Sequence, residues 1–413
     1  MLFLKWFTSA TVRQAWQASK HVEKTLRHQE DLLSVESVAL VQADIDNVRV
    51  ACRKGSKADV QASLKKLEVS ANKWLKTYSH AALRENIEVA LVAIAVAMGI
   101  RTFFLQPFKI PTGSMQPTLY GVTHEDLRGR DDVKIPNAFT RFVDYWFNGV
   151  SYIHVVAKSS GTITYDPPSK LVLFNRSQTY RINGVPQPPI WFPPDGLFER
   201  GGIAPGAEVA AGQDIIRMRV ISGDHLFVDR VSYNFRRPSR GDVVVFETHG
   251  IQGIAEMSRE LADTYYIKRL CGLGGERLTL KKDYDVRHPG YGDIPVGHLV
   301  VNGTNEITAA TPHFELLYSF PDAVRGSNVI PFRENHYIGH ALLRGLSPGS
   351  QYDVPPQHYF VMGDNTLNSS DSRYWGDFER NKVIGKSFFV YWPIGGTTFK
   401  GEERPSRFGW AHR

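Results

Sequence analysis

Cysteine is nearly absent from this sequence of 413 residues, which contains only Cys52 and Cys271. The two cysteines stand on opposite sides of an uninterrupted apolar run from Val89 to Ile100. If that run crosses a membrane, the two thiols lie in different compartments and cannot pair. A fold held together by disulfides is therefore not expected.

The sequence also lacks a basic stripe with interleaved aromatic residues. The net charge is +7, but the lysines and arginines are spread along the chain. A nucleic-acid-binding surface would concentrate them, so no nucleic-acid partner is predicted. The excess positive charge favours an anionic membrane surface, and membrane lipid is the predicted partner.

Proline is missing from the whole segment between Thr11 and His80. The segment is rich in Ala, Leu, Val, Lys and Glu, and apolar residues recur three and four positions apart, as at Leu64 and Leu67. This pattern predicts a helical segment over residues 1–85, with two helices that form a solvated antiparallel hairpin broken near residues 55–56. No histidine, cysteine or carboxylate cluster with the spacing of a site occurs there, so no catalytic role is expected.

The apolar run predicts one transmembrane helix over residues 86–107. With Glu88 and Arg101 at the two interfaces, the stretch is long enough for the roughly 20 residues that a spanning helix needs. Phe103 and Phe104 suit the aromatic belt at a membrane interface. A buried helix of a soluble protein is the alternative, since the apolar centre of the run is short.

The charges before the run predict its orientation. Residues 5–84 contain more lysine and arginine than aspartate and glutamate. The positive-inside tendency therefore places the N-terminus in the cytoplasm and everything after Phe108 on the exported side. A cleavable signal peptide is excluded because about 85 residues precede the run.

After Phe108 the composition changes to glycine, proline, aromatic and β-branched residues. Short apolar runs bounded by turn-forming residues, such as Val243 to Phe246, predict strands. Residues 108–413 are therefore expected to form a mainly β, antiparallel domain. Two stretches, at about 121–214 and 283–356, lie between the motifs described below and are predicted to be β insertions.

One serine stands in a rigid frame soon after the apolar run, in the segment Ile110-Pro111-Thr112-Gly113-Ser114-Met115-Gln116-Pro117. Pro111 pushes the residue before it into extended geometry, and Gly113 lets another backbone approach closely. Pro117 limits any helix that begins at Ser114. This frame predicts that the serine is presented on a turn or at a strand end.

Three more segments follow this serine in a fixed order. They are Ser222-Gly223-Asp224 with the residues up to Tyr233, Arg240-Gly241-Asp242 with Tyr266-Ile267-Lys268-Arg269, and the polar run from Gly363 to Gly376. Together the four segments resemble the type I signal peptidases, membrane-anchored serine proteases that cleave signal peptides from exported proteins. The resemblance extends from about Arg101 to Pro393 and leaves large stretches unmatched.

A serine nucleophile needs a base within hydrogen-bond reach. The chain has 14 histidines, yet none lies in a matched segment at the position of a base. Lys268 follows alternating apolar residues, as on a strand, and burial beside such residues lowers a lysine pKa by several units from its reference value of about 10.4. A Ser-Lys pair is a known variant of the serine-protease arrangement.

The resemblance implies that Ser114 is the nucleophile and that Lys268 is the general base. The Ser114 N–H and the Thr112 hydroxyl are expected to stabilise the oxyanion, and Ser369 is expected to orient the lysine. The remaining residues that the resemblance implies are the bracing ion pair Asp371 and Arg373 and the pocket walls Ile110, Pro111 and Met115. No metal or other cofactor is expected.

The implied substrates are the signal peptides of exported preproteins, with Ala or Gly at the positions one and three before the cut. Such a peptide would bind extended, as an added strand at a sheet edge. The implied location is the bacterial inner membrane, with a single span, a cytoplasmic N-terminus and the catalytic domain on the exported side.

Two other interpretations compete with this resemblance. Self-cleaving repressor proteases also use a Ser-Lys dyad, but they carry a DNA-binding domain and lack an apolar anchor, and no helix-turn-helix pattern occurs here. A membrane-anchored β scaffold with a decayed site is the non-enzymatic reading. The intact Ser114, Lys268, Ser369 and Asp371 argue against it.

Overall fold

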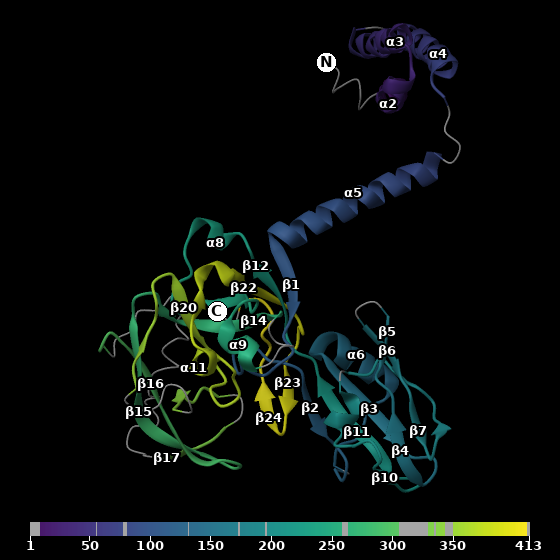
Figure 1. The fold of residues 1–413 in the computed structure, drawn as a ribbon. Coiled ribbons are helices and arrows are strands. Elements are labelled where there is room, and N and C mark those ends of the chain that lie inside the picture. Colours follow the sequence, from purple (N-terminus) through teal and green to yellow (C-terminus); the bar gives the residue numbers. More distant parts are fainter. Residues whose placement is uncertain are drawn as a thin grey trace. The chain divides into compact units, whose positions relative to one another are not determined.

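The structure is a computed structural model that describes residues 9–54, 56–76, 81–130, 132–171, 174–194, 196–257, 263–304, 329–333, 336–342 and 350–410. The chain divides into two compact units, Met1–Val96 and Ala97–Arg413 (Figure 1). The first unit is helical, and the second consists mostly of β-strands.

The first unit contains three long helices, α2 (Ala10–Gln29), α3 (Val35–Lys54) and α4 (Lys57–Trp74). The predicted break near residues 55–56 is present, and Ser56 caps α4 in a capping box with Asp59. The two-helix prediction is wrong because a second break follows the short 3-10 helix η1 (Glu30–Leu32). The signal for this break is Ser34, whose hydroxyl accepts a hydrogen bond from the Ser37 N–H at 3.3 Å, as an N-cap does.

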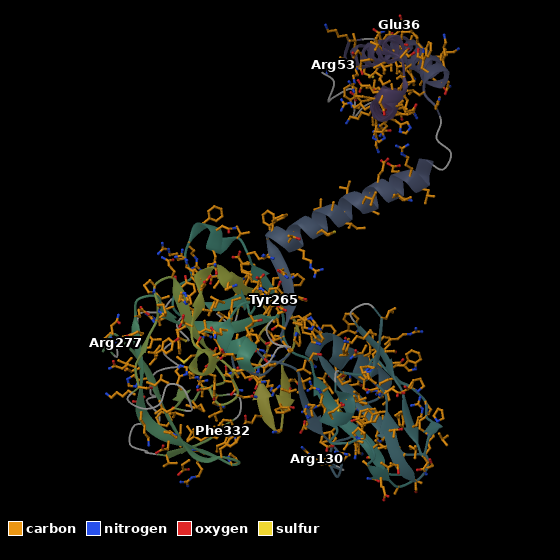
Figure 2. All side chains as sticks on the ribbon, in the orientation of Figure 1. Glu36, Arg53, Arg130, Tyr265, Arg277 and Phe332 are labelled. Carbon is orange, nitrogen blue, oxygen red and sulfur yellow. The ribbon has the colours of Figure 1, made fainter. Side chains whose placement is uncertain are left out.

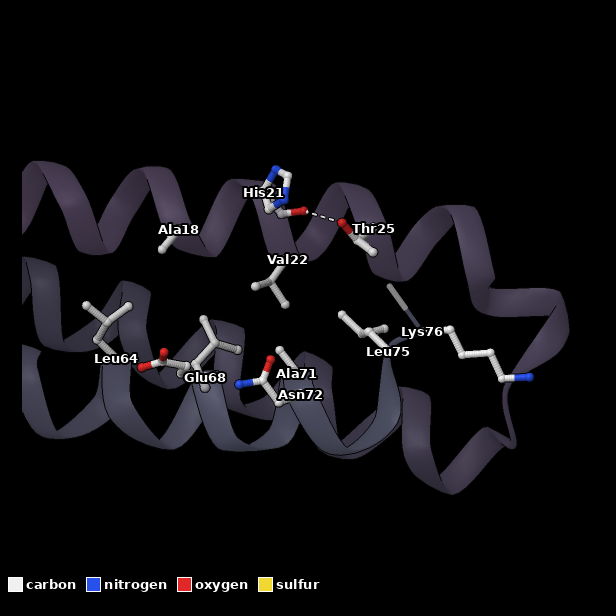
Figure 3. Close-up of a pocket in the computed structure, with 11 residues that line it drawn as sticks. Ala18, His21, Val22, Thr25, Leu64, Glu68, Ala71, Asn72, Leu75 and Lys76 are labelled. Carbon is white, nitrogen blue, oxygen red and sulfur yellow. Dashed lines mark hydrogen bonds between the residues drawn. The ribbon is translucent and has the colours of Figure 1, made fainter. Parts of the chain in front are cut away.

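The three helices bury a core of their own, so they are more than a solvated hairpin. The buried apolar residues of this core are Val12, Ala15, Leu26, Val41, Ile45, Val48, Ala51, Cys52, Val60 and Leu67. A groove of about 740 Å³ remains between α2 and α4, with Val22, Leu64 and Leu75 on its walls (Figure 3). None of the predicted site residues lines it.

Helix α5 (Ala81–Phe103) contains the apolar run. Within the described residues it is the one helix long and apolar enough to cross a membrane, over Leu83–Phe103, with a mean hydropathy of 1.6. The helix ends before the predicted residue 107, and strand β1 (Leu105–Lys109) follows at once. Pro107 explains this end, because proline has no N–H for a helix and disfavours helical geometry in the residue before it.

A seven-stranded antiparallel sheet forms the centre of the second unit, which confirms the predicted fold class. Its strands, in spatial order, are β1, β12 (His225–Asp229), β22 (Val383–Trp392), β13 (Val243–Glu247), β14 (Tyr265–Leu273), β20 (His358–Met362) and β21 (Phe378–Glu379). Alternate residues of β12, β13 and β22 pack with Met115 and Leu119 in one buried cluster. This cluster supports the segment that carries Ser114.

The stretch predicted as the first insertion forms small sheets around a separate core that includes Ile163, Phe198 and Ile216. Its strands are β2 (Thr123–Asp126), β3 (Val150–Val156), β4 (Gly161–Tyr165), β5 (Ser169–Leu171), β6 (Phe174–Gln178), β7 (Tyr180–Ile182), β8 (Val185–Pro186), β9 (Ile190–Trp191), β10 (Glu208–Val209) and β11 (Asp214–Ile221). Two helices accompany them, α6 (Ala138–Asn148) and α7 (Leu197–Arg200).

The second predicted insertion contributes most of a five-stranded sheet, whose strands β15 and β16 are drawn in green in Figure 1. Its strands are β15 (Arg277–His288), β16 (Gly292–Val301), β17 (Val329–Pro331), β18 (His340–Ala341) and β19 (Tyr352–Asp353). The remaining elements are the helices α8 (Ser232–Phe235), α9 (Gln252–Met257), α11 (Ser372–Trp375) and η4 (Arg380–Lys382) and the strands β23 (Thr397–Phe399) and β24 (Glu402–Arg404).

Candidate active site

Ser114 lies on a turn that follows strand β1. The turn begins where the Ile110 N–H donates to the Asp224 carbonyl oxygen at 2.9 Å. Gly223 makes this approach possible, since a Cβ there would lie 1.9 Å from the Ile110 carbonyl oxygen. The turn closes with a 3.1 Å hydrogen bond from the Gln116 N–H to the Gly113 carbonyl oxygen. The serine is thus held in a tight turn, as its Pro/Gly frame predicted.

Lys268 lies beside this turn, on strand β14. Its Nζ is 2.8 Å from Ser114 Oγ and 3.1 Å from the Ile267 carbonyl oxygen. The exposed fractions of Ser114 and Lys268 are 7% and 4%. The structure therefore brings the predicted nucleophile and the predicted base into direct contact at a site that is nearly closed to solvent.

The surroundings of Lys268 suit a base. Burial lowers the pKa of its ammonium group to about 8, although the nearby carboxylates of Asp371 and Asp364 act in the opposite direction. The positive charge of Arg373 adds to the lowering. A substantial fraction of the lysine is then neutral near pH 8, and the neutral amine can accept a proton from a hydroxyl.

Thr112 stands next to the nucleophile, as predicted for an oxyanion donor. Its Oγ1 is 3.5 Å from Ser114 Oγ, and the residue is exposed. This distance is at the upper limit for a hydrogen bond, so the Thr112 hydroxyl is only weakly engaged by the serine. It is available to donate to an oxygen that develops charge beside Ser114.

Asp371 and Arg373 form the predicted ion pair. Their side chains are completely buried, and Arg373 Nη2 is 2.8 Å from Asp371 Oδ2. Burial alone would raise the pKa of Asp371, but the charge and hydrogen bonds of Arg373 hold it below its ordinary value. Arg373 also donates to Thr366 Oγ1 at 2.8 Å and to the Thr366 carbonyl oxygen at 2.9 Å. The pair thereby fixes the loop that follows β20.

Ser369 lies on that loop, but it does not orient Lys268 by a hydrogen bond in this structure. Its Oγ is buried and makes no hydrogen bond of normal geometry with the described residues, although it is close enough to Asp371 to help lower that pKa. A Cβ on Gly363 would lie 2.1 Å from Ser369 Oγ and 2.5 Å from the Ser114 carbonyl oxygen. The missing side chain of Gly363 therefore lets the loop of Ser369 pack against the turn of Ser114.

Sequence reasoning did not identify the contacts of Asn365 and Asp364. The Asn365 N–H donates to the Ser114 carbonyl oxygen at 3.0 Å, and its side-chain amide donates to the Gly113 carbonyl oxygen at 3.0 Å. Asp364 is fully buried and accepts a 2.8 Å hydrogen bond from Nε of Arg269, the residue after Lys268. The sequence signal that could have pointed to these contacts is the position of both residues in the polar run from Gly363 to Gly376.

The three predicted pocket residues differ in exposure. Pro111 is exposed, whereas Ile110 and Met115 are 3% and 0% exposed and belong to the core under the turn. In this structure Met115 supports the turn of Ser114 from below. A role as a pocket wall stays a prediction for Ile110 and Met115.

Strand β14 presents an open edge next to Lys268. On one side its residues from Tyr265 to Arg269 pair with β13. On the other side pairing with β20 begins only at Arg269, so among the described strands Tyr265 to Lys268 have no partner there. Figure 2 labels Tyr265 at the start of this edge. An extended peptide could pair with it and place a carbonyl group near Ser114.

The sequence of this chain is similar to those of known proteins. The model of a family described as "Signal peptidase, peptidase S26" matches residues 83–124 and 217–392, more than half of the chain. The match includes Ser114, Lys268, Ser369 and Asp371 and leaves out residues 125–216, most of the first insertion.

Curated relatives are named signal peptidase I. Those of Leptolyngbya laminosa and Pseudomonas aeruginosa are 26% and 29% identical to this chain, over 41% of it in both cases and over 61% and 60% of their own lengths. The one of Aquifex aeolicus is 26% identical over 42% of this chain and 70% of its own length. The chain thus matches about three fifths of the length of the first of these relatives.

A crystal structure of a signal peptidase I from Enterococcus faecalis is also similar in sequence, at 25% identity over 37% of this chain and 97% of that chain. Its TM-score is 0.21, which is too low for the superposition to inform the fold. The fold assignment therefore depends on the sheet topology described above.

Proposed function

Because the chain belongs to the signal peptidase family, peptidase S26, we propose that it is a membrane-anchored serine endopeptidase that removes signal peptides from exported proteins. The observation that carries this proposal is the 2.8 Å contact between Ser114 Oγ and Lys268 Nζ. A buried lysine with a pKa of about 8 beside a serine on a tight turn is equipped for nucleophilic catalysis.

The first half of the reaction forms an acyl-enzyme. Neutral Lys268 takes the proton of the Ser114 hydroxyl while Oγ attacks the scissile carbonyl carbon. The carbonyl oxygen becomes an oxyanion, which the Ser114 N–H and the Thr112 hydroxyl stabilise. When the tetrahedral intermediate collapses, protonated Lys268 gives its proton to the leaving amine, and the mature protein departs with a free N-terminus.

The second half regenerates the enzyme. Neutral Lys268 now takes a proton from a water molecule, whose oxygen attacks the ester carbonyl carbon. Collapse of the second tetrahedral intermediate breaks the ester bond, and the proton returns from Lys268 to Ser114 Oγ. The signal peptide leaves with a C-terminal carboxylate, so one water molecule is consumed in each turnover.

The remaining predicted site residues position these groups. Asp371 and Arg373 fix the loop that packs on the turn of Ser114, and their buried pair contributes to the charge balance around Lys268. We assign Ser369 to the same loop as a positioning residue. Its unengaged hydroxyl is a candidate partner for the lysine once substrate binds and the site tightens.

The substrate would pair with the open edge from Tyr265 to Lys268. In an extended chain, residues one and three before the cut point to the same face, so both would enter pockets on the side of Ser114. Pro111 is exposed beside this position, and Ile110 lies under it. Because the turn packs closely against the core, pockets beside it would be shallow. Shallow pockets suit Ala or Gly.

The topology belongs to the same proposal. Bacterial relatives and the apolar helix α5 together indicate a membrane-anchored protein. We further propose a single span in the bacterial plasma membrane, with the basic helical unit in the cytoplasm and the β unit on the exported side.

The test is cleavage of a preprotein that carries a signal peptide by the purified full chain. We expect a product cut after a small residue with the unsubstituted chain and none with Ser114→Ala. Ser159→Ala removes an exposed serine of the first insertion and serves as the matched control. Cleavage by Ser114→Ala at the rate of the Ser159→Ala control would overturn the proposal.

A further inference from the structure

Helix α6 is unusual because none of its residues is buried. It lies between residues 125 and 216, outside the segments that the family model matches. Five of its eleven residues are exposed aromatic residues, with exposed fractions of 77% for Phe139, 61% for Phe142, 46% for Tyr145, 55% for Trp146 and 54% for Phe147.

The helix is nevertheless well formed. Asn137 caps its start, where Oδ1 accepts from the Thr140 N–H at 2.9 Å. Gly149 ends it in left-handed geometry, with φ of 67°, and donates to the Tyr145 carbonyl oxygen at 3.1 Å. These caps fix the two ends of the helix, and no apolar face of the helix is buried. Its aromatic side chains are therefore free to serve another purpose.

Hydrogen bonds to two backbone carbonyl groups connect the end of α6 to the central sheet and the residues after it. Trp392 Nε1 donates to the Trp146 carbonyl oxygen at 2.8 Å, and the Ile394 N–H donates to the Phe147 carbonyl oxygen at 2.9 Å. Since these bonds use carbonyl groups, they hold the helix in place and leave its aromatic side chains exposed. The result is a fixed aromatic surface, which soluble proteins rarely leave open unless it has a partner.

The position of α6 identifies the partner. Trp392, whose ring is 5.7 Å from that of Tyr145, stands opposite His225 in the sheet, and His225 stands opposite Lys109 of β1. Lys109 follows the end of the candidate membrane helix α5 by a few residues. At about 3.3 Å per residue along a strand and about 4.8 Å between strands, the backbone of Trp392 lies roughly 22 Å from the point where α5 ends. Helix α6 is attached to the ring of Trp392.

Aromatic residues also cover the sheet between these two points. Leu226, Val228 and Val390 face the core, so their neighbours in β12 and β22 face outward. On this outer side Phe227 packs on Tyr391 with 4.6 Å between ring centroids, and Phe389 packs on the exposed Trp410 at 4.8 Å. An aromatic surface thus extends from β12, the neighbour of β1, across β22 towards α6.

We propose that α6 is an interfacial helix that places its aromatic side chains in the headgroup region of a phospholipid bilayer. Tyrosine and tryptophan prefer this region because their rings are amphipathic. A helix of eleven residues is about 16 Å long, too short to span a bilayer, so it lies in the plane of the interface. The β unit then contacts the membrane through the insertion as well as through α5.

The test uses the full chain in nanodiscs that hold one copy each. A fluorescent label is attached at Phe142→Cys on the aromatic face or at Arg141→Cys, an exposed position about 100° further around the helix. The native Cys52 and Cys271 are buried, and the unsubstituted chain measures their residual labelling. We expect doxyl groups on the lipid acyl chains to quench the label at position 142 at least threefold more than the label at position 141.

A second variant keeps the proposal open to refutation. Adding Phe139→Ser and Trp146→Ser to Phe142→Cys should reduce the quenching to the level of the Arg141→Cys control. The circular dichroism spectrum should stay unchanged, because neither residue is buried. Equal quenching at positions 141 and 142, or quenching at neither, would overturn the proposal. The proposal would also be overturned if the label at position 142 were shielded only in nanodiscs that hold two copies of the chain.

Discussion

Asn365 and Ser114 are joined by a 3.0 Å hydrogen bond from the Asn365 N–H to the Ser114 carbonyl oxygen. The Asn365 side chain makes a second bond, to the carbonyl oxygen of Gly113, a residue 252 positions away in the sequence. One residue therefore holds the turn of the nucleophile from two directions. This relationship connects the serine segment to the polar run from Gly363 to Gly376.

Replacement of Asn365 by Ala should lower kcat about tenfold, with little change in KM. The side-chain bond to Gly113 is lost, and the turn can shift relative to Lys268 by enough to weaken proton transfer. The free energy of unfolding should fall by about 1 kcal/mol, the usual contribution of one hydrogen bond. Asn381→Ala removes an exposed asparagine and is the control. An Asn365→Ala variant with the kcat of the control would contradict this positioning role.

Replacement of Gly363 by Ala should damage the active site strongly. The added Cβ would lie 2.5 Å from the Ser114 carbonyl oxygen, which is backbone and cannot simply rotate away. We expect at least a hundredfold loss of activity together with a lower melting temperature. Gly290→Ala is the matched control, because a Cβ there would meet only the His288 ring, at an ordinary 3.6 Å. Equal melting temperatures for the two variants would show that the loop of Gly363 can move away from Ser114.

Replacement of Lys268 by Ala should abolish cleavage, because no other group takes the proton of Ser114. Loss of a general base costs a factor of about 10² to 10⁴ in rate. Folding should be nearly unchanged, since removal of a buried amine also removes its desolvation cost. Single-turnover cleavage and thermal unfolding measure the two effects, and Lys158→Ala, an exposed lysine, is the control. Substantial activity in Lys268→Ala, or better activity in Lys268→His, would show that the Ser-Lys assignment is wrong.

The pH dependence follows from the lowered pKa of Lys268. Only the neutral amine accepts a proton, so kcat/KM should rise with pH and level off above a pKa of about 8. Below that value the rate should fall about tenfold per pH unit, because the neutral fraction falls by that factor. Measurement of kcat/KM from about pH 6 to pH 10 tests this. A kcat/KM that still rises about tenfold per pH unit near pH 10 would show that the base does not have the lowered pKa of the buried lysine.

The sequence predicted the parts of the molecule that short patterns encode. The frame around Ser114 and the alternation before Lys268 are local signals, and the structure brings the two side chains together. Contacts between distant segments left no local signal, which is why the bonds of Asn365 were missed. The resemblance implied that Met115 is a pocket wall, whereas in this structure its side chain packs in the core under the turn.

The helices also show how far local patterns in the sequence can predict the structure. Gly55 and Ser56 mark one break of the first unit, but the break before Ser34 contains neither glycine nor proline and depends on a hydroxyl cap. The aromatic character of α6 is visible in the sequence, yet its exposure is not, because an apolar helix is buried in most folds. Exposure is decided by the elements that surround a helix, and only the structure describes those.

The last prediction concerns the substrate positions one and three before the cut, which should both require small residues. An extended chain along the edge from Tyr265 to Lys268 would direct both side chains toward the turn of Ser114, where Ile110 and Met115 already fill the space beneath. Substrates with Ala at both positions should be cut. Replacement of either Ala by Phe or Lys should lower kcat/KM by about 10² or more, since overpacking or an unpaired charge costs a few kcal/mol. Phe at the position just after the cut is the matched control, because that side chain points away from both pockets. Equal cleavage of the Ala and Phe substrates would refute a pocket of this kind even if Ser114 proved to be the nucleophile.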